Sequence, residues 1–374
     1  MPLYIVLGFV IMFGLLVSVH EWGHYYAARR LGIHATTFSI GFGPVIWSRV
    51  DARGTRWQLC CFLIGGYVKF LGDKDGSSAS ASDELTSQSV AMSPAERRRH
   101  YLLRGPGARA LVIGAGPATN IVLGLALLVG LYMGIGRPSV PPVIAQVVAG
   151  EPAELAGVRP GDRVVTVNGH PARAFSDVHD EIALYPGGLV RLELEREEAG
   201  ASRRLTIDVK SKVGTVEAFG AKQTVGRIGI VSGRMTVEPV GFVEAVTVGL
   251  KDVYKQTKQT FVALGQIATL ERPLSDMGGP IKMAETSGHA LQAGPVLFIF
   301  FIAVISINLG ILNLTPIPVL DGGALVFCAI EAVTRRPISP RVLAYSHKAG
   351  GVALLALMGA VMVSDVTSLV QRML

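Results

Sequence analysis

The sequence predicts a polytopic α-helical membrane protein with four transmembrane helices, a re-entrant β-hairpin region and one inserted α+β domain. The composition is the first reason: 50% of the 374 residues are hydrophobic and only 17% are charged, whereas soluble domains carry about 25% charged residues. The second reason is that four separate segments approach the roughly 20 apolar residues that a spanning helix needs. The same composition excludes disorder, collagen and coiled coil as the main character of the chain.

The predicted spans are apolar runs that contain few charged residues. They cover roughly residues 3–31, 108–133, 296–314 and 349–363. The first span has neither a basic stretch at its start nor a small-residue cleavage site before Arg29. We therefore expect it to be a retained helix and not a cleaved signal peptide.

Basic residues predict the orientation of the chain. The net charge is +7, and Lys and Arg gather in the two loops that join the first span to the second and the third to the fourth. By the positive-inside rule both loops are cytoplasmic, which places the termini and the insert on the opposite side. We expect a multi-pass protein of a bacterial inner membrane with its insert in the periplasm. The surroundings are membrane lipid, and no nucleic-acid-binding pattern is present.

These observations divide the chain into eight segments. We expect a first transmembrane helix (1–34), a cytoplasmic and re-entrant β-loop region with a polar linker (35–107), a second helix (108–134), a periplasmic domain (135–213), a connector with amphipathic helices (214–295), a third helix with an Asp-Gly-Gly segment (296–324), a cytoplasmic loop (325–348) and a fourth helix (349–374).

The loop after the first span contains short β-type segments. They cover residues 38–44, 56–62 and 65–70 and are too apolar for an ordinary solvated loop. Backbone at membrane depth must be hydrogen-bonded within the protein, so a re-entrant hairpin sheet that leans on the helices is expected. Residues 76–93 are rich in Ser and polar, which is typical of a linker.

The first span carries the motif His20-Glu-Trp-Gly-His24. A spacing of four residues places both imidazoles on one face of a helix, where they can share a metal ion. Glu21 lies beside them and can take a proton from water. Three ionisable groups within a membrane span are costly and are usually functional. The alternative to a metal site is that His20, Glu21 and His24 form a polar patch that faces a cytoplasmic vestibule.

A catalytic zinc site needs a third protein ligand. No further His or Glu follows at close spacing, and the best distant candidate is Asp321, which follows two prolines after the third span. From spacing alone, a helix N-cap at the membrane boundary is an equally good interpretation of Asp321. Asn308 and Asn313 in the third span either bond neighbouring helices or hold a substrate backbone.

The motifs together resemble the site-2 protease family of intramembrane zinc metalloproteases, of the bacterial regulator of sigma-E protease type. The resemblance extends over both ends of the chain in the order of the family. The matching segments are His20–His24, Phe38–Pro44, Gly65–Lys69, Ala115–Asn120, Gly278–Ile281 and Asn308–Gly323.

This resemblance implies specific roles. His20, His24 and Asp321 would bind one Zn2+ per chain, and Glu21 would be the catalytic base. Asn308 and Asn313 would position the substrate. A β-loop would pair with an unwound substrate segment by strand addition; its residues are Gly65, Gly66, Tyr67, Val68 and Lys69.

Within the insert, Ala156–Gly169 resembles a bacterial PDZ domain. The flanking residues predict strands at 143–148, 163–168, 189–196 and 204–209 and a helix at 175–185. Such a domain would bind a peptide C-terminus or a substrate segment by β-addition. A folded spacer without affinity for a ligand is the alternative, and one such domain is evident where some family members carry two.

The expected activity is that of a zinc metalloendopeptidase in regulated intramembrane proteolysis. It would cleave single-span membrane proteins that another protease has already trimmed, such as an anti-sigma factor or a signal-peptide remnant. Two alternatives remain at this point. One is a non-catalytic membrane scaffold that presents the PDZ domain. The other is a transporter, although the repeated broken helices of transporters are lacking.

Overall fold

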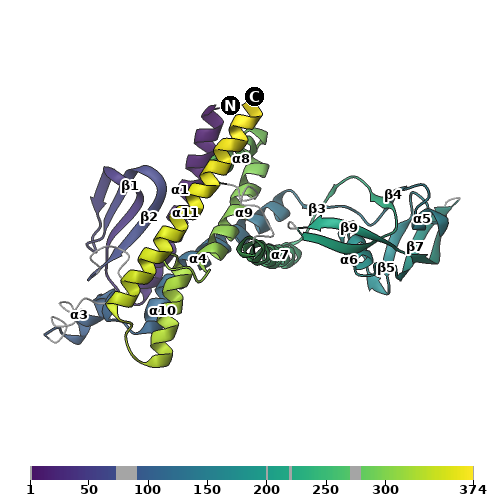
Figure 1. Ribbon diagram of the computed structural model, residues 1–374. Helices are drawn as coiled ribbons and strands as arrows, with labels where there is room; N and C mark the ends of the chain where they lie inside the picture. The colour runs from purple at the N-terminus through teal and green to yellow at the C-terminus, as the bar shows by residue number, and fades with distance from the viewer. Residues whose placement is uncertain (1, 73–90, 199–200, 219–220, 270–278, 374) are drawn as a thin grey trace. The chain divides into compact units, whose positions relative to one another are not determined.

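The computed structural model describes residues 2–72, 91–198, 201–218, 221–269 and 279–373 (Figure 1). The chain forms two compact units. One unit, here called the membrane unit, comprises Met1–Gly130, Val246–Leu264 and Pro273–Leu374, and the other, the inserted unit, comprises Leu131–Ala245 and Gly265–Arg272. Most of the predicted polar linker lies outside the described residues.

Four helices of the membrane unit are long and apolar enough to cross a membrane, and they contain the four predicted apolar segments almost completely. They are α1 (Pro2–Arg30), α4 (Pro106–Gly134), α9 (Pro295–Asn313) and α11 (Pro340–Met373). Apolar side chains cover their outer surfaces: Leu3 on α1 is 67% exposed and Leu355 on α11 is 71% exposed. Such surfaces suit hydrocarbon, in which a helix satisfies its own backbone hydrogen bonds.

The membrane unit also contains α3 (Pro94–Arg99), the 3-10 turn η1 (Tyr101–Leu103), α8 (Pro280–Ala293), α10 (Asp321–Thr334) and the middle of α7 (Phe242–Ala268), whose two ends belong to the inserted unit. Residues 325–348, which were expected to be a cytoplasmic loop, are therefore largely helical. They contain most of α10 and the start of α11. The predicted connector does contain helices, namely α7 and α8.

Glycines allow the helices of the membrane unit to approach closely. A methyl group on Gly124 of α4 would meet Ile307 of α9, and one on Gly310 of α9 would meet the Pro117 carbonyl of α4. Small residues at such contacts let apolar helices pack by van der Waals attraction, which is the main source of helix association in lipid. The position of α4 against α9 is thereby fixed.

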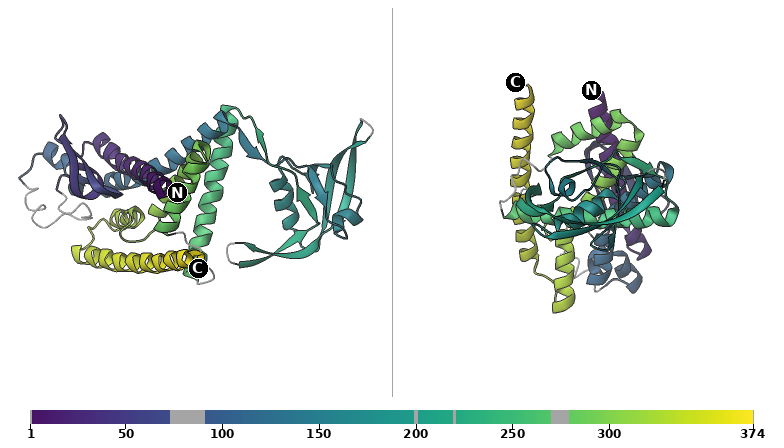
Figure 2. Two further views of the ribbon diagram at one scale, coloured as in Figure 1. Left: turned by 90° about the horizontal axis from the view of Figure 1, so that it is seen from above. Right: turned by 90° about the vertical axis from the view of Figure 1, so that its right-hand side faces the viewer.

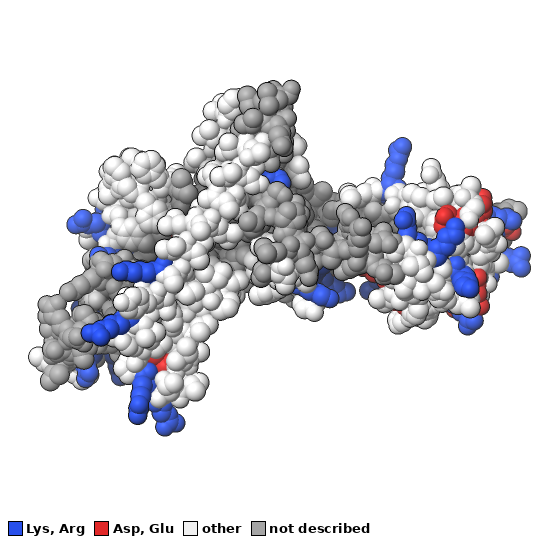
Figure 3. Space-filling model, in the orientation of Figure 1, with Lys and Arg blue, Asp and Glu red and all other residues white. Residues whose placement is uncertain are grey.

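Basic side chains of the membrane unit gather around α3 and α10, and others lie on α7, at Lys251, Lys255 and Lys258. Figure 3 shows the helical surfaces largely in white, with Lys and Arg around α3 and α10. Arg97, Arg98 and Arg99 lie in the last turn of α3, and Arg335 ends α10. An apolar band with basic residues gathered around α3 and α10 is the distribution that the positive-inside rule associates with a cytoplasmic face.

The predicted β region of the membrane unit consists of β1 (Ala35–Val50) and β2 (Arg56–Phe70), which form a two-stranded sheet. Register shifts bend the pair, so that residues 38–40 of β1 stand beside both 57–59 and 66–68 of β2. In the described chain no other strand pairs with residues 66–70, here called the open edge of β2. Helix α1 lies beside it: a methyl group on Gly66 would meet Val17, and the Val68 backbone hydrogen-bonds Glu21. At the far end of β1 the side chain of Ile46 is 65% exposed, as a re-entrant position in lipid would allow.

The inserted unit contains the remaining strands and two helices. Its elements are β3 (Arg137–Ser139), β4 (Ile144–Val147), α5 (Pro152–Leu155), β5 (Arg163–Val167), β6 (His170–Pro171), α6 (Phe175–Ala183), β7 (Leu189–Glu198), β8 (Ala201–Lys210), β9 (Lys212–Ala218), β10 (Ala221–Arg227), β11 (Ile230–Ser232) and β12 (Thr236–Glu238). The strands and the helix predicted from 143 to 209 are thus present. The connector, which was expected to be helical, begins with the strands β9 to β12.

One four-stranded sheet and three strand pairs build the inserted unit (Figure 2). The sheet has the order β6-β5-β7-β8, and β11 pairs with β4, β10 with β9 and β12 with β3. Alternation along β7 buries Val190, Leu192 and Leu194 against Val178 and Ile182 of α6. This period of two residues is the sequence signal from which the strand was predicted.

A buried ion pair supports the sheet of the inserted unit. The guanidinium of Arg196 donates two hydrogen bonds to Asp162, at 2.6 and 2.8 Å, and the Asp162 side chain is 1% exposed. These bonds raise the pKa of Arg196. Arg191 forms a comparable pair with Asp208, but there both side chains are well exposed.

We predict that Arg196→Met lowers the free energy of unfolding of the inserted unit by about 3–5 kcal/mol, because it leaves the Asp162 carboxylate buried without its partner. Arg191→Met is the matched control, and its cost should be below about 1 kcal/mol because water screens an exposed pair. Native-state hydrogen exchange of the β5 and β7 amides in the full chain measures both. Equal costs for the two variants would contradict this assignment.

Candidate metal centre

Helix α1 presents both histidines of the motif to one point. The Nε2 atoms of His20 and His24 lie 3.2 Å apart, and the rings meet edge to face. Both side chains are largely buried, with 11% and 13% exposed. The four-residue spacing has therefore brought two ligating nitrogens together inside the membrane unit.

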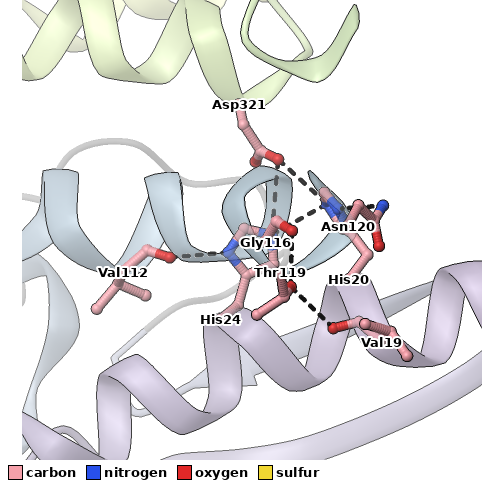
Figure 4. Close-up of polar contacts among 8 residues, drawn as sticks. All are labelled: Val19, His20, His24, Val112, Gly116, Thr119, Asn120 and Asp321. Atoms are coloured by element: carbon pink, nitrogen blue, oxygen red, sulfur yellow. Dashed lines mark hydrogen bonds and ion pairs between the residues drawn. The ribbon is translucent and has the colours of Figure 1, made fainter. Parts of the chain in front are cut away.

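Asp321 completes this cluster from a distant part of the sequence. Its Oδ2 atom lies 3.1 Å from His20 Nε2 and 3.6 Å from His24 Nε2 (Figure 4). The ligating atoms of these three residues all lie within 4.8 Å of one another. The N-cap of α10 is Leu320, and Asp321 is the first residue of the helix. The structure therefore does not support the interpretation of Asp321 as an N-cap.

The segment before α10 is shaped by close backbone contacts. Methyl groups on Gly322 and Gly323 would collide with the backbone of residues 314–318, so that only glycine lets this segment pack on the first turn of α10. Val319 has a φ of 97°, which a β-branched residue rarely adopts. Strain of this kind persists where the surroundings determine the backbone, and here it precedes the residue that reaches the histidines.

Helix α4 lies directly behind the histidines, and its role was not foreseen from the sequence. The Nδ1–H of His24 donates to the Val112 carbonyl at 2.9 Å, and Thr119 Oγ1 donates to the Val19 carbonyl of α1 at 3.1 Å. A methyl group on Gly116 would collide with the His24 ring. The signal that could have revealed this surface is a set of small and polar residues at helical spacing within an apolar span.

The predicted base and part of the predicted β-loop share a cavity with the cluster. The cavity has a volume of about 280 Å3, and Glu21, Gly66, Tyr67 and Val68 line it beside His20, His24 and Asp321. A methyl group on Gly66 would lie 3.0 Å from Glu21 Cγ, which shows how closely the open edge of β2 passes the carboxylate. Gly65 packs on Phe42, and the Lys69 carbonyl accepts a hydrogen bond from Thr36.

A buried ion pair also lines this cavity. Arg109 of α4 and Glu331 of α10 are hydrogen-bonded to each other and are both about nine-tenths buried. The second Glu331 oxygen accepts from the Ile338 amide at 3.2 Å. This pair anchors the helix that begins with Asp321 to the helix that backs the histidines.

The two predicted asparagines do not join the cluster. Asn308 Oδ1 accepts a hydrogen bond of 3.0 Å from Thr260 of α7, and Gln256 of the same helix donates to the Val304 carbonyl at 2.8 Å. Asn313 is the half-buried last residue of α9. Neither asparagine is among the described residues that line the cavity.

The donor set of the cluster fits a zinc ion. Two imidazole nitrogens and one carboxylate oxygen are the three protein ligands of a common class of catalytic zinc site, and such a site keeps one position open. The Val112 carbonyl can only accept a hydrogen bond, so it holds the proton of His24 on Nδ1 and leaves the Nε2 lone pair toward the cluster. Neutral imidazoles and one carboxylate also balance part of the charge of a divalent cation.

The fold and this site define the chain as a membrane protein with a buried His-His-Asp centre, and comparison with known proteins identifies its family. The model of peptidase family M50 matches residues 8–357. A protein of Agrobacterium fabrum named "Putative zinc metalloprotease" is 37% identical over 98% of this chain and 96% of its own length. One of Rickettsia conorii with the same description is 31% identical over 97% of this chain and 99% of its own length.

A third relative is the regulator of sigma-E protease of Salmonella typhimurium, which is 28% identical over 97% of this chain and 98% of its own length. The chain therefore belongs to peptidase family M50, the site-2 protease family of zinc metalloproteases. This confirms the family that the motifs predicted.

We predict that Gly116→Ala weakens zinc binding by about 10- to 100-fold, because the new methyl group displaces the His24 ring from its contact with Val112. Gly114→Ala is the control on the same helix, since a methyl group there meets nothing within 4 Å. Zinc content after dialysis against a graded chelator measures both variants. Equal zinc retention by the two would contradict the packing described for α4.

Proposed function

We propose that this chain is an intramembrane zinc endopeptidase that cleaves transmembrane segments of other membrane proteins. One observation carries the proposal: two histidines within a candidate membrane span converge with Asp321, and the open edge of β2 lines the same cavity. A peptidase whose site lies within a span acts on peptide bonds at or near membrane depth.

His20, His24 and Asp321 would bind one zinc ion per chain. When bound, zinc acts as a Lewis acid that polarises a peptide carbonyl and lowers the pKa of water. Glu21 is the carboxylate beside these ligands in the cavity. Its role in the proposal is to accept a proton from the attacking water and to deliver it to the leaving amine.

Residues 66–70 of β2 would hold the substrate. A helical substrate hides its peptide bonds within its own hydrogen bonds, so it must unwind before hydrolysis, and its freed backbone groups need partners in an apolar environment. An open strand edge offers those partners by strand addition. Gly66, Tyr67 and Val68 of this edge line the same cavity as Glu21, so a substrate paired with the edge would lie in the cavity that holds the carboxylate. Asn308 and Asn313 would contribute to positioning after Asn308 exchanges its bond to Thr260.

The biological setting is proposed from the relatives and the charge distribution. We place the protein in a bacterial inner membrane, with the basic ends of α3 and α10 in the cytoplasm and the inserted unit in the periplasm. One relative is named for regulation of a sigma factor. The proposed substrates are single-span proteins trimmed by an earlier cut, such as an anti-sigma factor or a signal-peptide remnant.

Replacing Glu21 by Gln tests the proposed chemistry. We predict that cleavage of a single-span model substrate in detergent falls by at least about 100-fold, because a carboxamide cannot accept the proton. The zinc content should stay that of the wild type, because Glu21 is not a proposed ligand. Equal cleavage by both proteins would refute the role of Glu21 and point to a contaminating protease.

We further propose that the inserted unit is a PDZ-type domain that binds an extended peptide. Its support is the order of strands and helices from β4 to β8, which follows the pattern that Ala156–Gly169 suggested. We predict saturable binding of labelled peptides with free C-termini to the full chain by fluorescence anisotropy, and weaker binding of amidated peptides. Absence of binding across a peptide library would favour a spacer.

A further inference from the structure

Asn120 is a buried polar residue on α4 with no assigned role. Its side chain is completely buried, and its amide Nδ2 atom lies 3.3 Å from Nδ1 of His20, on α1 (Figure 4). Among the described residues, no hydrogen-bond partner reaches its Oδ1 atom. An amide in an apolar span is unfavourable unless its hydrogen bonds serve the structure or the site.

The protonation of His20 determines what Asn120 must do. His20 directs Nε2 toward His24 and Asp321, so a metal at this point takes the Nε2 lone pair. A neutral imidazole then carries its proton on Nδ1, and the neighbour of Nδ1 has to accept a hydrogen bond. A half-turn of the Asn120 amide places Oδ1 where Nδ2 lies, because the two atoms occupy equivalent positions about the side-chain bond.

We propose that Asn120 is a positioning residue of the metal centre. Its Oδ1 accepts the hydrogen bond from His20 Nδ1–H, which fixes the orientation of the ring and keeps Nε2 available to zinc. This inference rests on the proposed zinc chemistry. Asn120 is then the counterpart of the Val112 carbonyl, which holds His24 in the same way. One helix thereby orients both histidines of the motif.

Contacts with neighbouring helices hold the backbone of α4 at Asn120. The Ser306 hydroxyl of α9 donates to the Asn120 carbonyl at 2.7 Å, and both residues are completely buried. One residue earlier, Thr119 Oγ1 lies 2.8 Å from the Gly116 carbonyl of its own helix and 3.1 Å from the carbonyl of Val19, immediately before His20. The α4 backbone at Asn120 is thus held by α1 and α9, so the amide meets His20 from a rigid position.

Zinc affinity of the full-length protein in detergent tests the proposal. Asn120→Leu keeps a similar side-chain size but has no acceptor, and it should raise the zinc Kd by about 10- to 100-fold. Asn120→Asp keeps an acceptor, so its Kd should stay within about 3-fold of the wild-type value. Ser287→Ala is the control, since it removes a completely buried hydroxyl that bonds the Ala284 carbonyl of its own helix, α8; its Kd should also stay within about 3-fold.

Competition with a chelator gives the Kd, and the absorption spectrum of the cobalt-substituted protein reports the geometry of the site independently of activity. The proposal predicts an altered cobalt spectrum for Asn120→Leu and a wild-type spectrum for Ser287→Ala. Melting temperatures of the metal-free proteins show whether the variants fold, and Asn120→Ala replaces Asn120→Leu if that variant does not.

Unchanged affinity in the variants without an acceptor would overturn the proposal. So would equal weakening by Asn120→Leu and Asn120→Asp, because the acceptor would then be irrelevant. A wild-type protein that binds no zinc would instead refute the proposed function, and the two failures are thereby distinguished.

Discussion

Hydrocarbon cannot supply hydrogen bonds, and this constraint governs the centre of the membrane unit. Polar groups placed there have to be held by other groups of the chain. His24 bonds the Val112 carbonyl, the Asn120 amide faces His20, and both histidines meet Asp321. Each contact crosses between helices, so the cluster depends on how closely α1, α4 and α10 approach. Glycines at the contact points make that approach possible.

The same geometry connects substrate handling to chemistry. The open edge of β2 and the Glu21 carboxylate line one cavity with the metal-ligand candidates, and the buried Arg109–Glu331 pair lines the same cavity. An unwound peptide paired with this edge of β2 would therefore lie in the cavity that holds His20, His24 and Asp321. The family resemblance implies that Asn308 positions the substrate. In this structure its Oδ1 instead accepts a hydrogen bond from Thr260 of α7.

Local patterns in the sequence predicted much of this structure. The four apolar helices follow from runs of apolar residues, β7 and β8 from alternation, and the turn after β5 from an Asn-Gly pair whose φ angles are both positive, whereas β9 to β12 were not predicted. Helix α10 was missed because Pro316 and Pro318 end the preceding span and Gly322 and Gly323 disfavour helix locally, whereas close packing on residues 314–318 requires the glycines. The roles of Val112 and Asn120 depend on contacts between distant segments, which spacing along one helix cannot show.

The central claim is that two imidazoles and one carboxylate from two separate helices hold one zinc ion. X-ray absorption at the zinc edge of the purified full-length protein tests it most directly. The account predicts one zinc per chain, with the scattering of two imidazoles, light-atom ligands and no sulfur. A sulfur shell would contradict the account, as would fewer than two imidazoles. Cys328 lines the same cavity, so the sulfur shell tests whether its thiolate replaces one of the three proposed ligands.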